Sequence, residues 1–163
     1  MHSRIIELST EPIEESERIT ASDIPEWFYH SVADYVDDDT DRTADMEWFM
    51  TSFGSLVTFD RKDEKLTFCE DFKPQYFKPR YERFLLCARA LTGITLEEFI
   101  GDYRPSAPNY DAGYKVYQLN DSYTDKFDFY VYQDDSLEPL DKWLRNADLG
   151  VPYYIGGTID YHF

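Results

Sequence analysis

The sequence has no long apolar run and only two cysteines, and each shortage excludes a class of protein. No stretch approaches the roughly 20 apolar residues that a membrane-spanning helix needs. Arg4 and Glu7 interrupt the N-terminus before a signal-peptide apolar region can form. Cys69 and Cys87 are isolated, without Cys-x-x-Cys spacing, so neither a disulfide framework nor a thiolate metal site is indicated. We expect a cytoplasmic protein that does not bind a membrane.

Basic residues are also scarce. The 163 residues include 16 Lys and Arg against 33 Asp and Glu, which gives a formal net charge of -17 and a pI near 4.3. A surface of this sign repels phosphates, so we expect no direct binding to nucleic acid. Apolar residues make up 42% of the chain and aromatic residues 18%. This composition can bury a core, and the length is typical of one domain.

The negative charge is concentrated in one quarter of the chain. The segment from Glu7 to Glu47 carries 14 acids and two bases, a balance of -12. The segment from Arg61 to Arg89 has eight bases and five acids, a balance of +3. The sequence therefore predicts an acidic N-terminal part and a mildly basic central helix.

Motifs that identify common enzymes are missing. The sequence contains no Gly-rich phosphate loop, G-x-S-x-G elbow or H-E-x-x-H pair. A calcium loop starting at Asp37 would place Arg42 where glycine is required and Trp48 where a bidentate glutamate is required. We therefore expect no bound metal, no other cofactor and no catalytic residues, and we regard an enzyme as the less favoured class.

Periodicity predicts helices and strands in irregular order. Apolar spacing of three and four residues indicates helices, and alternation or short β-branched runs indicate strands. The expected helices cover residues 23–35, 46–54, 74–91 or 79–91, 95–101 and 136–146, and the expected strands cover 4–8, 56–59, 65–68 and 126–132. Gly54 is expected to end the second helix, Thr95 and Glu98 to form a capping box, and the strands 56–59 and 65–68 to form a hairpin.

Three segments need separate interpretation. Residues 114–125 suit a strand or a helix equally, and residues 152–163 form either a hairpin or one strand with a bulge at the Gly-Gly pair. A loop is expected around Pro105 and Pro108. Together the elements predict a single α+β domain over residues 1–163, with a mixed or antiparallel sheet that includes both terminal strands, one long helix and several short helices.

The two ends of the chain carry a resemblance. Residues 4–13 (RIIELSTEPI) and 154–163 (YIGGTIDYHF) resemble a group of small acidic bacterial proteins of unknown function. The resemblance implies a bacterial, single-domain protein. It implies no activity, because the group has none to carry over.

The acidic segment is the candidate binding site. Carboxylates three or four residues apart on a helix lie roughly 5 to 6 Å apart, comparable to the spacing of backbone phosphates. We therefore hypothesise a non-catalytic module that binds a protein with a basic surface, in the manner of a nucleic-acid mimic. A plain solubilising surface is the competing interpretation. The candidate partner-binding residues are Asp34, Asp37, Asp38, Asp39, Asp41, Asp45 and Glu47.

The alternative is a small enzyme or ligand-binding domain. Its pocket would be lined by Tyr130, Tyr132, Tyr153 and His162, because these side chains lie on strands near the C-terminus. Asp160 and His162 would share one strand face, since they are two residues apart. Two such groups alone do not make a metal site. The oligomeric state is not indicated by the sequence.

Overall fold

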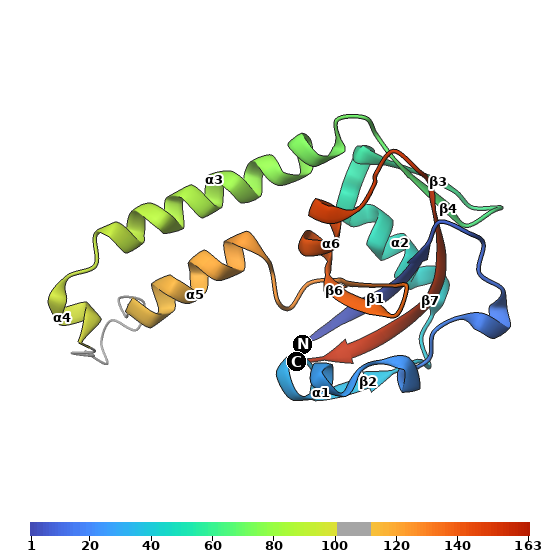
Figure 1. The fold of residues 1–163 in the computed structure, drawn as a ribbon, viewed down its shortest axis with the longest axis horizontal. Helices are drawn as coiled ribbons and strands as arrows, with labels where there is room; N and C mark the ends of the chain where they lie inside the picture. Colours follow the sequence, from blue (N-terminus) through green and yellow to red (C-terminus); the bar gives the residue numbers. More distant parts are fainter. Residues whose placement is uncertain (101–111) are drawn as a thin grey trace. The chain divides into compact units, whose positions relative to one another are not determined.

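The computed structural model describes residues 1–100 and 112–163, and these form an α+β protein (Figure 1). The expected loop around Pro105 and Pro108 lies outside the described residues. The chain forms two compact units: unit 1 contains Met1–Lys73 and Lys126–Phe163, and unit 2 contains Pro74–Asp125. No helix among the described residues has the length and apolar character needed to cross a bilayer.

Unit 1 is built on a mixed sheet. Its strands lie in the order β3-β4-β7-β1-β5-β6, and β2 pairs with β7 beside this path. Only β1 and β5 are parallel among the described pairs, and the other pairs are antiparallel. The strands are β1 (His2–Ser9), β2 (Tyr35–Asp37), β3 (Val57–Asp60), β4 (Lys65–Phe68), β5 (Tyr130–Gln133), β6 (Ser136–Pro139) and β7 (Tyr153–His162).

Both terminal strands lie in the sheet, as the sequence predicted, and the structure pairs them with each other at its centre. β1 pairs with β7 from His2↔His162 to Ser9↔Tyr154, and the register shifts between Ile6 and Leu8. The Gly-Gly pair therefore lies within one long strand, at a bulge-like irregularity. Of the two structures expected for residues 152–163, the single strand with a bulge is confirmed and the hairpin is not. Both strands are buried along most of their length.

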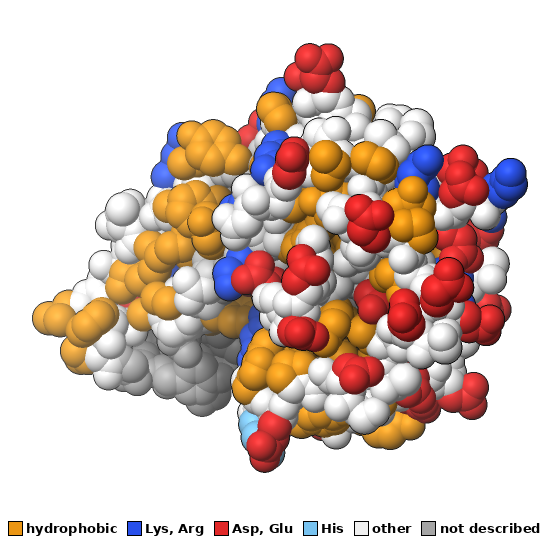
Figure 2. All heavy atoms as spheres, turned by 45° about the vertical axis from the view of Figure 1, so that its right-hand side comes forward, with side chains coloured by type: hydrophobic (Ala, Val, Ile, Leu, Met, Phe, Trp, Pro, Cys, Tyr) orange, Lys and Arg blue, Asp and Glu red, His pale blue; other side chains and the backbone are white. Residues whose placement is uncertain are grey.

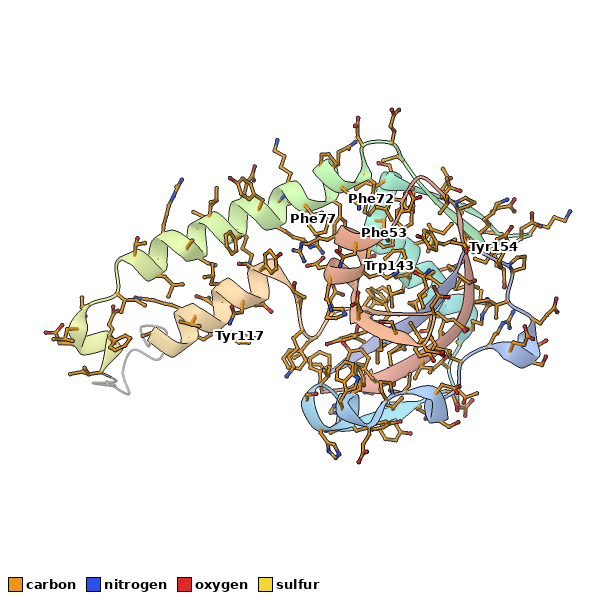
Figure 3. The ribbon with its side chains drawn as sticks, viewed as in Figure 1. Phe53, Phe72, Phe77, Tyr117, Trp143 and Tyr154 are labelled. Carbon is orange, nitrogen blue, oxygen red and sulfur yellow. The ribbon has the colours of Figure 1, made fainter. Side chains whose placement is uncertain are left out.

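Helices and 3-10 turns cover both faces of this sheet. On one face Phe28 of α1 (Glu26–Ser31) makes edge-to-face contacts with Tyr130 and Tyr161. On the other face α2 (Arg42–Phe53) and α6 (Leu140–Asn146) contribute to a second aromatic cluster. Phe53, Phe72 and Trp143 lie close together in this cluster (Figure 3). Among the described residues the 3-10 turns are η1 (Glu15–Glu17), η2 (Ala21–Asp23) and η3 (Gly54–Leu56).

Unit 2 is helical. It contains most of α3 (Phe72–Thr92), with Pro79 inside the helix, and the short α4 (Leu96–Phe99). Thr95 caps α4 in the predicted capping box with Glu98. The segment 114–125, which the sequence left open between strand and helix, is helical as far as Tyr123, within α5 (Ala112–Tyr123). Lys115 Nζ lies 2.9 Å from Glu98 Oε1 and links α5 to α4.

Three sequence predictions about local structure are wrong. The helix predicted over 23–35 is confined to α1, because Thr20 and Asp23 form an earlier capped turn and Tyr35 enters β2. The strand predicted over 126–132 is β5, and its supposed wet face is buried at Tyr130, which is 2% exposed.

The helix predicted from Ser136 begins only at Leu140. Asp134 and Asp135 both adopt positive φ, at 49° and 60°, and this tight turn directs Ser136–Pro139 back along β5 as β6. Helical spacing of Leu137, Leu140 and Leu144 did not reveal the change from strand to helix, because both elements bury these side chains.

Candidate functional site

The structure distributes the predicted acidic residues over a strand, a loop and a helix. Asp34 precedes β2, Asp37 ends it, and Asp41 is the N-cap of α2, where its side chain accepts a hydrogen bond from the Ala44 amide. Asp38 and Asp39 lie in the loop between them, and Asp45 and Glu47 lie within α2. The expected row of carboxylates on one helix face is therefore wrong.

Asp45 does not belong to the exposed surface. It is 4% exposed, and its carboxylate accepts hydrogen bonds from Arg4 Nε at 2.5 Å and from Thr158 Oγ1 at 3.0 Å. Arg4 also contacts Asp160 and lies 5.3 Å from the centroid of the Trp48 ring. Asp45 thus anchors α2 to the central strands β1 and β7, and it cannot reach a partner.

Three of the remaining carboxylates bond only to neutral donors. Asp37 accepts hydrogen bonds from the Asp39 amide at 2.9 Å and from the Tyr35 hydroxyl at 2.7 Å, which lower the pKa of Asp37 and keep it ionised. Asp38 accepts a hydrogen bond from the Ala21 amide at 2.8 Å. Asp41 is the cap described above. Neutral donors fix these side chains without cancelling their charge.

Asp34 and Glu47 are each paired with a base. Asp34 Oδ1 lies 2.7 Å from His162 Nδ1, and this hydrogen bond lowers the pKa of Asp34. Glu47 Oε1 lies 2.8 Å from Arg61 Nη1, with both side chains more than half exposed. Such exposed pairs are weak and exchange readily with other charges. The charge of this surface is therefore carried mainly by Asp37, Asp38, Asp39 and Asp41.

Aromatic side chains are exposed along the same part of the chain. Trp27 is 47% exposed, Tyr35 52% and Trp48 44%. Tyr35 was expected on the core face of the helix over 23–35, and it is exposed because it enters β2 instead. Figure 2 shows Asp and Glu side chains spread over one face of the molecule with apolar side chains exposed between them. Large aromatic side chains are typical anchors of protein interfaces.

The four residues of the predicted pocket do not meet. Tyr130 is buried beside Phe28, with ring centroids 4.9 Å apart, and Tyr153 is buried beside Trp143, with centroids 5.0 Å apart. These are separate aromatic clusters. The Tyr132 hydroxyl donates to Asp135 at 3.2 Å, and His162 lies at the far end of β7 from Tyr153.

His162 belongs instead to a cluster at the ends of β1 and β7. The rings of His2 and His162 are 4.9 Å apart, and each imidazole is paired with a different carboxylate. His162 bonds to Asp34, and His2 Nδ1 lies 2.8 Å from Asp160 Oδ2. Asp160 and His162 both lie in β7, two residues apart as expected, but the β1–β7 pairing brings His2 and not His162 into contact with the Asp160 carboxylate.

A shallow groove borders this cluster. It has a volume of about 320 Å³. Residues 29–34, from α1 and the segment after it, line one part of the groove, and Lys126, Phe127 and Phe163 line the rest. Phe127 and Phe163 stack in it with centroids 4.5 Å apart. The His162 imidazole bonds to the Met1 amine and the Asp34 carboxylate, and neither group is a hydroxyl or thiol nucleophile. Among the described residues no three His, Cys, Asp or Glu side chains form a metal site.

Comparison with known proteins gives no relative. No protein-family model matches the chain, and neither a curated protein nor a solved structure matches it.

Proposed function

We propose that this protein is a non-catalytic binding module whose acidic surface engages a protein partner with a basic surface. The acidic surface is defined here as Asp37, Asp38, Asp39 and Asp41, with Asp34 and Glu47 at its sides. The observation that carries the proposal is that Asp37, Asp38 and Asp41 are held in place by neutral donors, which do not neutralise a carboxylate. None of these three hydrogen bonds comes from Lys or Arg, so the carboxylates remain open to pairing with a cationic partner.

The distribution of charge between the two units supports the same function. Unit 1 contains 26 acidic and 10 basic residues, a formal charge of -16, whereas unit 2 contains seven acidic and six basic residues. A field of this strength raises the rate at which a cationic surface associates. Exposed Trp27 and Tyr35 supply apolar anchors that charge alone does not provide.

Competition with nucleic acid is the mechanism that we propose for this binding. Ionised carboxylates fixed in a loop and at a helix N-terminus would occupy the phosphate subsites of a basic groove. The mimicry rests on the loop between β2 and α2 and not on one helix face, since Asp45 is buried. The protein itself would bind no nucleic acid, because both surfaces are anionic.

The test is a pull-down from bacterial lysate with the Asp37→Asn, Asp38→Asn, Asp39→Asn and Asp41→Asn quadruple variant. Asn preserves the acceptor oxygens that bond to the Ala21 and Ala44 amides, so the fold is retained. A nucleic-acid-binding protein should be captured by the parent protein at low salt, and it should be lost at high salt and in the variant.

A matched control separates a specific surface from net charge. The variant Glu11→Gln, Glu14→Gln, Glu15→Gln and Glu17→Gln removes the same number of charges from exposed positions in the same unit. It should still capture the partner. If both variants lose capture of the partner equally, the acidic segment acts only as a solubilising surface. Equal capture by all three proteins would contradict the proposal directly.

The source and location of the protein follow from the sequence and are also proposals. We propose that the chain belongs to the small acidic bacterial proteins that its two ends resemble. The two motifs lie mainly on the paired strands β1 and β7, so they form one part of the sheet. A cytoplasmic location is supported by the free thiols of Cys69 and Cys87.

A further inference from the structure

The β3 strand leaves part of its backbone without a strand partner at the edge of the sheet. β3 pairs with β4, in the register Thr58↔Thr67, and the described residues place no strand on its other side. The Cys69 amide donates to the Leu56 carbonyl at 2.9 Å, so the backbone of Leu56 points toward the β4 side. Alternation along an antiparallel ladder then directs Thr58 to β4 and Phe59 outward.

A groove runs beside this edge. It has a volume of about 370 Å³, and residues from α2 and from the end of β3 line it. Met50 and Phe59 give it apolar walls, and the exposed ion pair of Glu47 and Arg61 closes one side. The side chain of Phe59 therefore lines the groove, while its backbone N–H and C=O point outward from the open edge, away from β4.

The other edge strands carry features that block pairing. β6 ends in Pro139, which lacks an N–H, and β2 is only three residues long. β3 has four residues with alternating burial, and it contains neither proline nor a described bulge. An unprotected edge with an adjoining groove is the arrangement used for recognition by strand addition.

We propose that β3 docks an extended segment of a partner protein, added as an antiparallel strand. The segment alternates apolar and basic residues. Its apolar side chains lie on the same face as Phe59 and enter the groove beside Met50. Its basic side chains lie on the face of Thr58 and Asp60, where the Asp60 carboxylate is exposed beside Lys65, its cross-strand neighbour on β4. The charge of unit 1, -16, selects a cationic segment over an anionic one and over a second copy of this chain.

This surface is distinct from the acidic surface of the proposed function. It is formed by backbone groups of β3 and side chains of α2, and none of Asp37, Asp38, Asp39 or Asp41 contributes to it. Glu47 lies at the side of both. The inference therefore holds or fails independently of the nucleic-acid mimicry.

The probe is an acetylated and amidated peptide of alternating Lys and Val, added to the full-length protein. In an antiparallel pair the residue opposite Phe59 has its side chain on the same face and its N–H directed at β3. Peptides with N-methyl groups on the Val residues should therefore lose about tenfold or more in affinity, whereas N-methyl groups on the Lys residues should have little effect. The two peptides have the same charge and composition.

Hydrogen exchange and two variants complete the test. The Phe59 amide should become protected when the parent peptide binds. Met50→Ala removes an apolar wall of the groove without changing its charge and should reduce affinity about tenfold, while the quadruple Asp to Asn variant should keep the protection at Phe59. Equal binding of both N-methylated peptides, or an unchanged Phe59 amide, would overturn the proposal, because attraction by charge alone requires no backbone pairing.

Discussion

Gly156 lies directly against Glu7 in the interior of unit 1. A Cβ placed at Gly156 would lie 2.1 Å from Glu7 Oε2 and 2.6 Å from Ile13 Cδ1. The same Glu7 oxygen accepts hydrogen bonds from the amides of Gly157 at 2.6 Å and Ile19 at 3.0 Å. The irregularity in β7 is therefore the site where a buried carboxylate is bonded to the backbone of two separate segments.

We expect Gly156→Ala to destabilise unit 1 by about 3 kcal/mol, the upper end of the cost of overpacking a buried site. The added methyl group must displace the Glu7 carboxylate and with it both amide hydrogen bonds. Urea unfolding followed by tryptophan fluorescence measures this, because Trp27, Trp48 and Trp143 all lie in unit 1. Gly150→Ala is the control, since the nearest atom there is an Asp148 side-chain oxygen at 3.2 Å, and a similar loss in that variant would contradict the explanation.

The sequence was sufficient for elements whose signals are local. The Thr95 capping box, the helix end at Gly54 and the hairpin of β3 and β4 were all predicted and are present. Gly54 has φ of 58°, a left-handed conformation that suits glycine. In each case a few neighbouring residues determine the geometry, so no information about distant contacts was needed.

The sequence was insufficient where distant contacts decide the structure. Tyr35 has helical spacing from Phe28, yet it forms a strand because β7 offers an open edge opposite His162. Asp45 looks like its neighbours in an acidic run, but Arg4, which is far away in the sequence, makes it a core residue. The open edge of β3 and its groove depend on strand order, and strand order has no signal in hydrophobic periodicity.

Arg42 closes a gap between two strands that pair with the same side of β7. Its Nε donates to the Gly156 carbonyl at 2.6 Å and its Nη2 donates to the Ile155 carbonyl at 2.7 Å. The same guanidinium forms a two-pronged pair with Glu64, with both contacts at 2.6 Å. Arg42 thereby satisfies β7 carbonyls that lie between the residues paired with β2 and those paired with β4.

This arrangement predicts a pH-dependent loss of stability in Arg42→Met. Hydrogen bonds from Arg42 hold the pKa of Glu64 below its ordinary value, although burial partly opposes the shift. A lowered folded-state pKa contributes stability that is present above the unfolded-state pKa of about 4.3 and is lost as the pH falls through the folded-state value. The difference in unfolding free energy between the parent protein and the variant should therefore be largest near neutral pH and shrink in acid.

Urea titrations between about pH 3 and 7 test this dependence. Lys62→Met removes an exposed positive charge from the turn between β3 and β4, which also contains Glu64, and serves as the control. If the difference in unfolding free energy between the parent protein and Arg42→Met stays constant over this range, the ion pair with Glu64 contributes nothing to stability. Only the hydrogen bonds from Arg42 to the β7 carbonyls would then matter.

The buried and exposed carboxylates of the acidic segment should respond in opposite ways to the same substitution. Asp45→Ala leaves the Arg4 guanidinium, whose side chain is 20% exposed, without its partner on α2, and leaves the Thr158 hydroxyl without an acceptor. Breaking a buried ion pair in this way costs about 3 kcal/mol. Asp39→Ala removes an exposed carboxylate that accepts no described hydrogen bond, so unit 1 should keep its stability within about 0.5 kcal/mol.

Partner capture by these two variants should follow the reverse order, measured at a temperature where both are folded. Asp45→Ala should retain it, because Asp45 is not on the surface, and Asp39→Ala should weaken it. A stable Asp45→Ala variant that fails to capture the partner would instead place Asp45 in the interface and contradict the division between structural and binding acids.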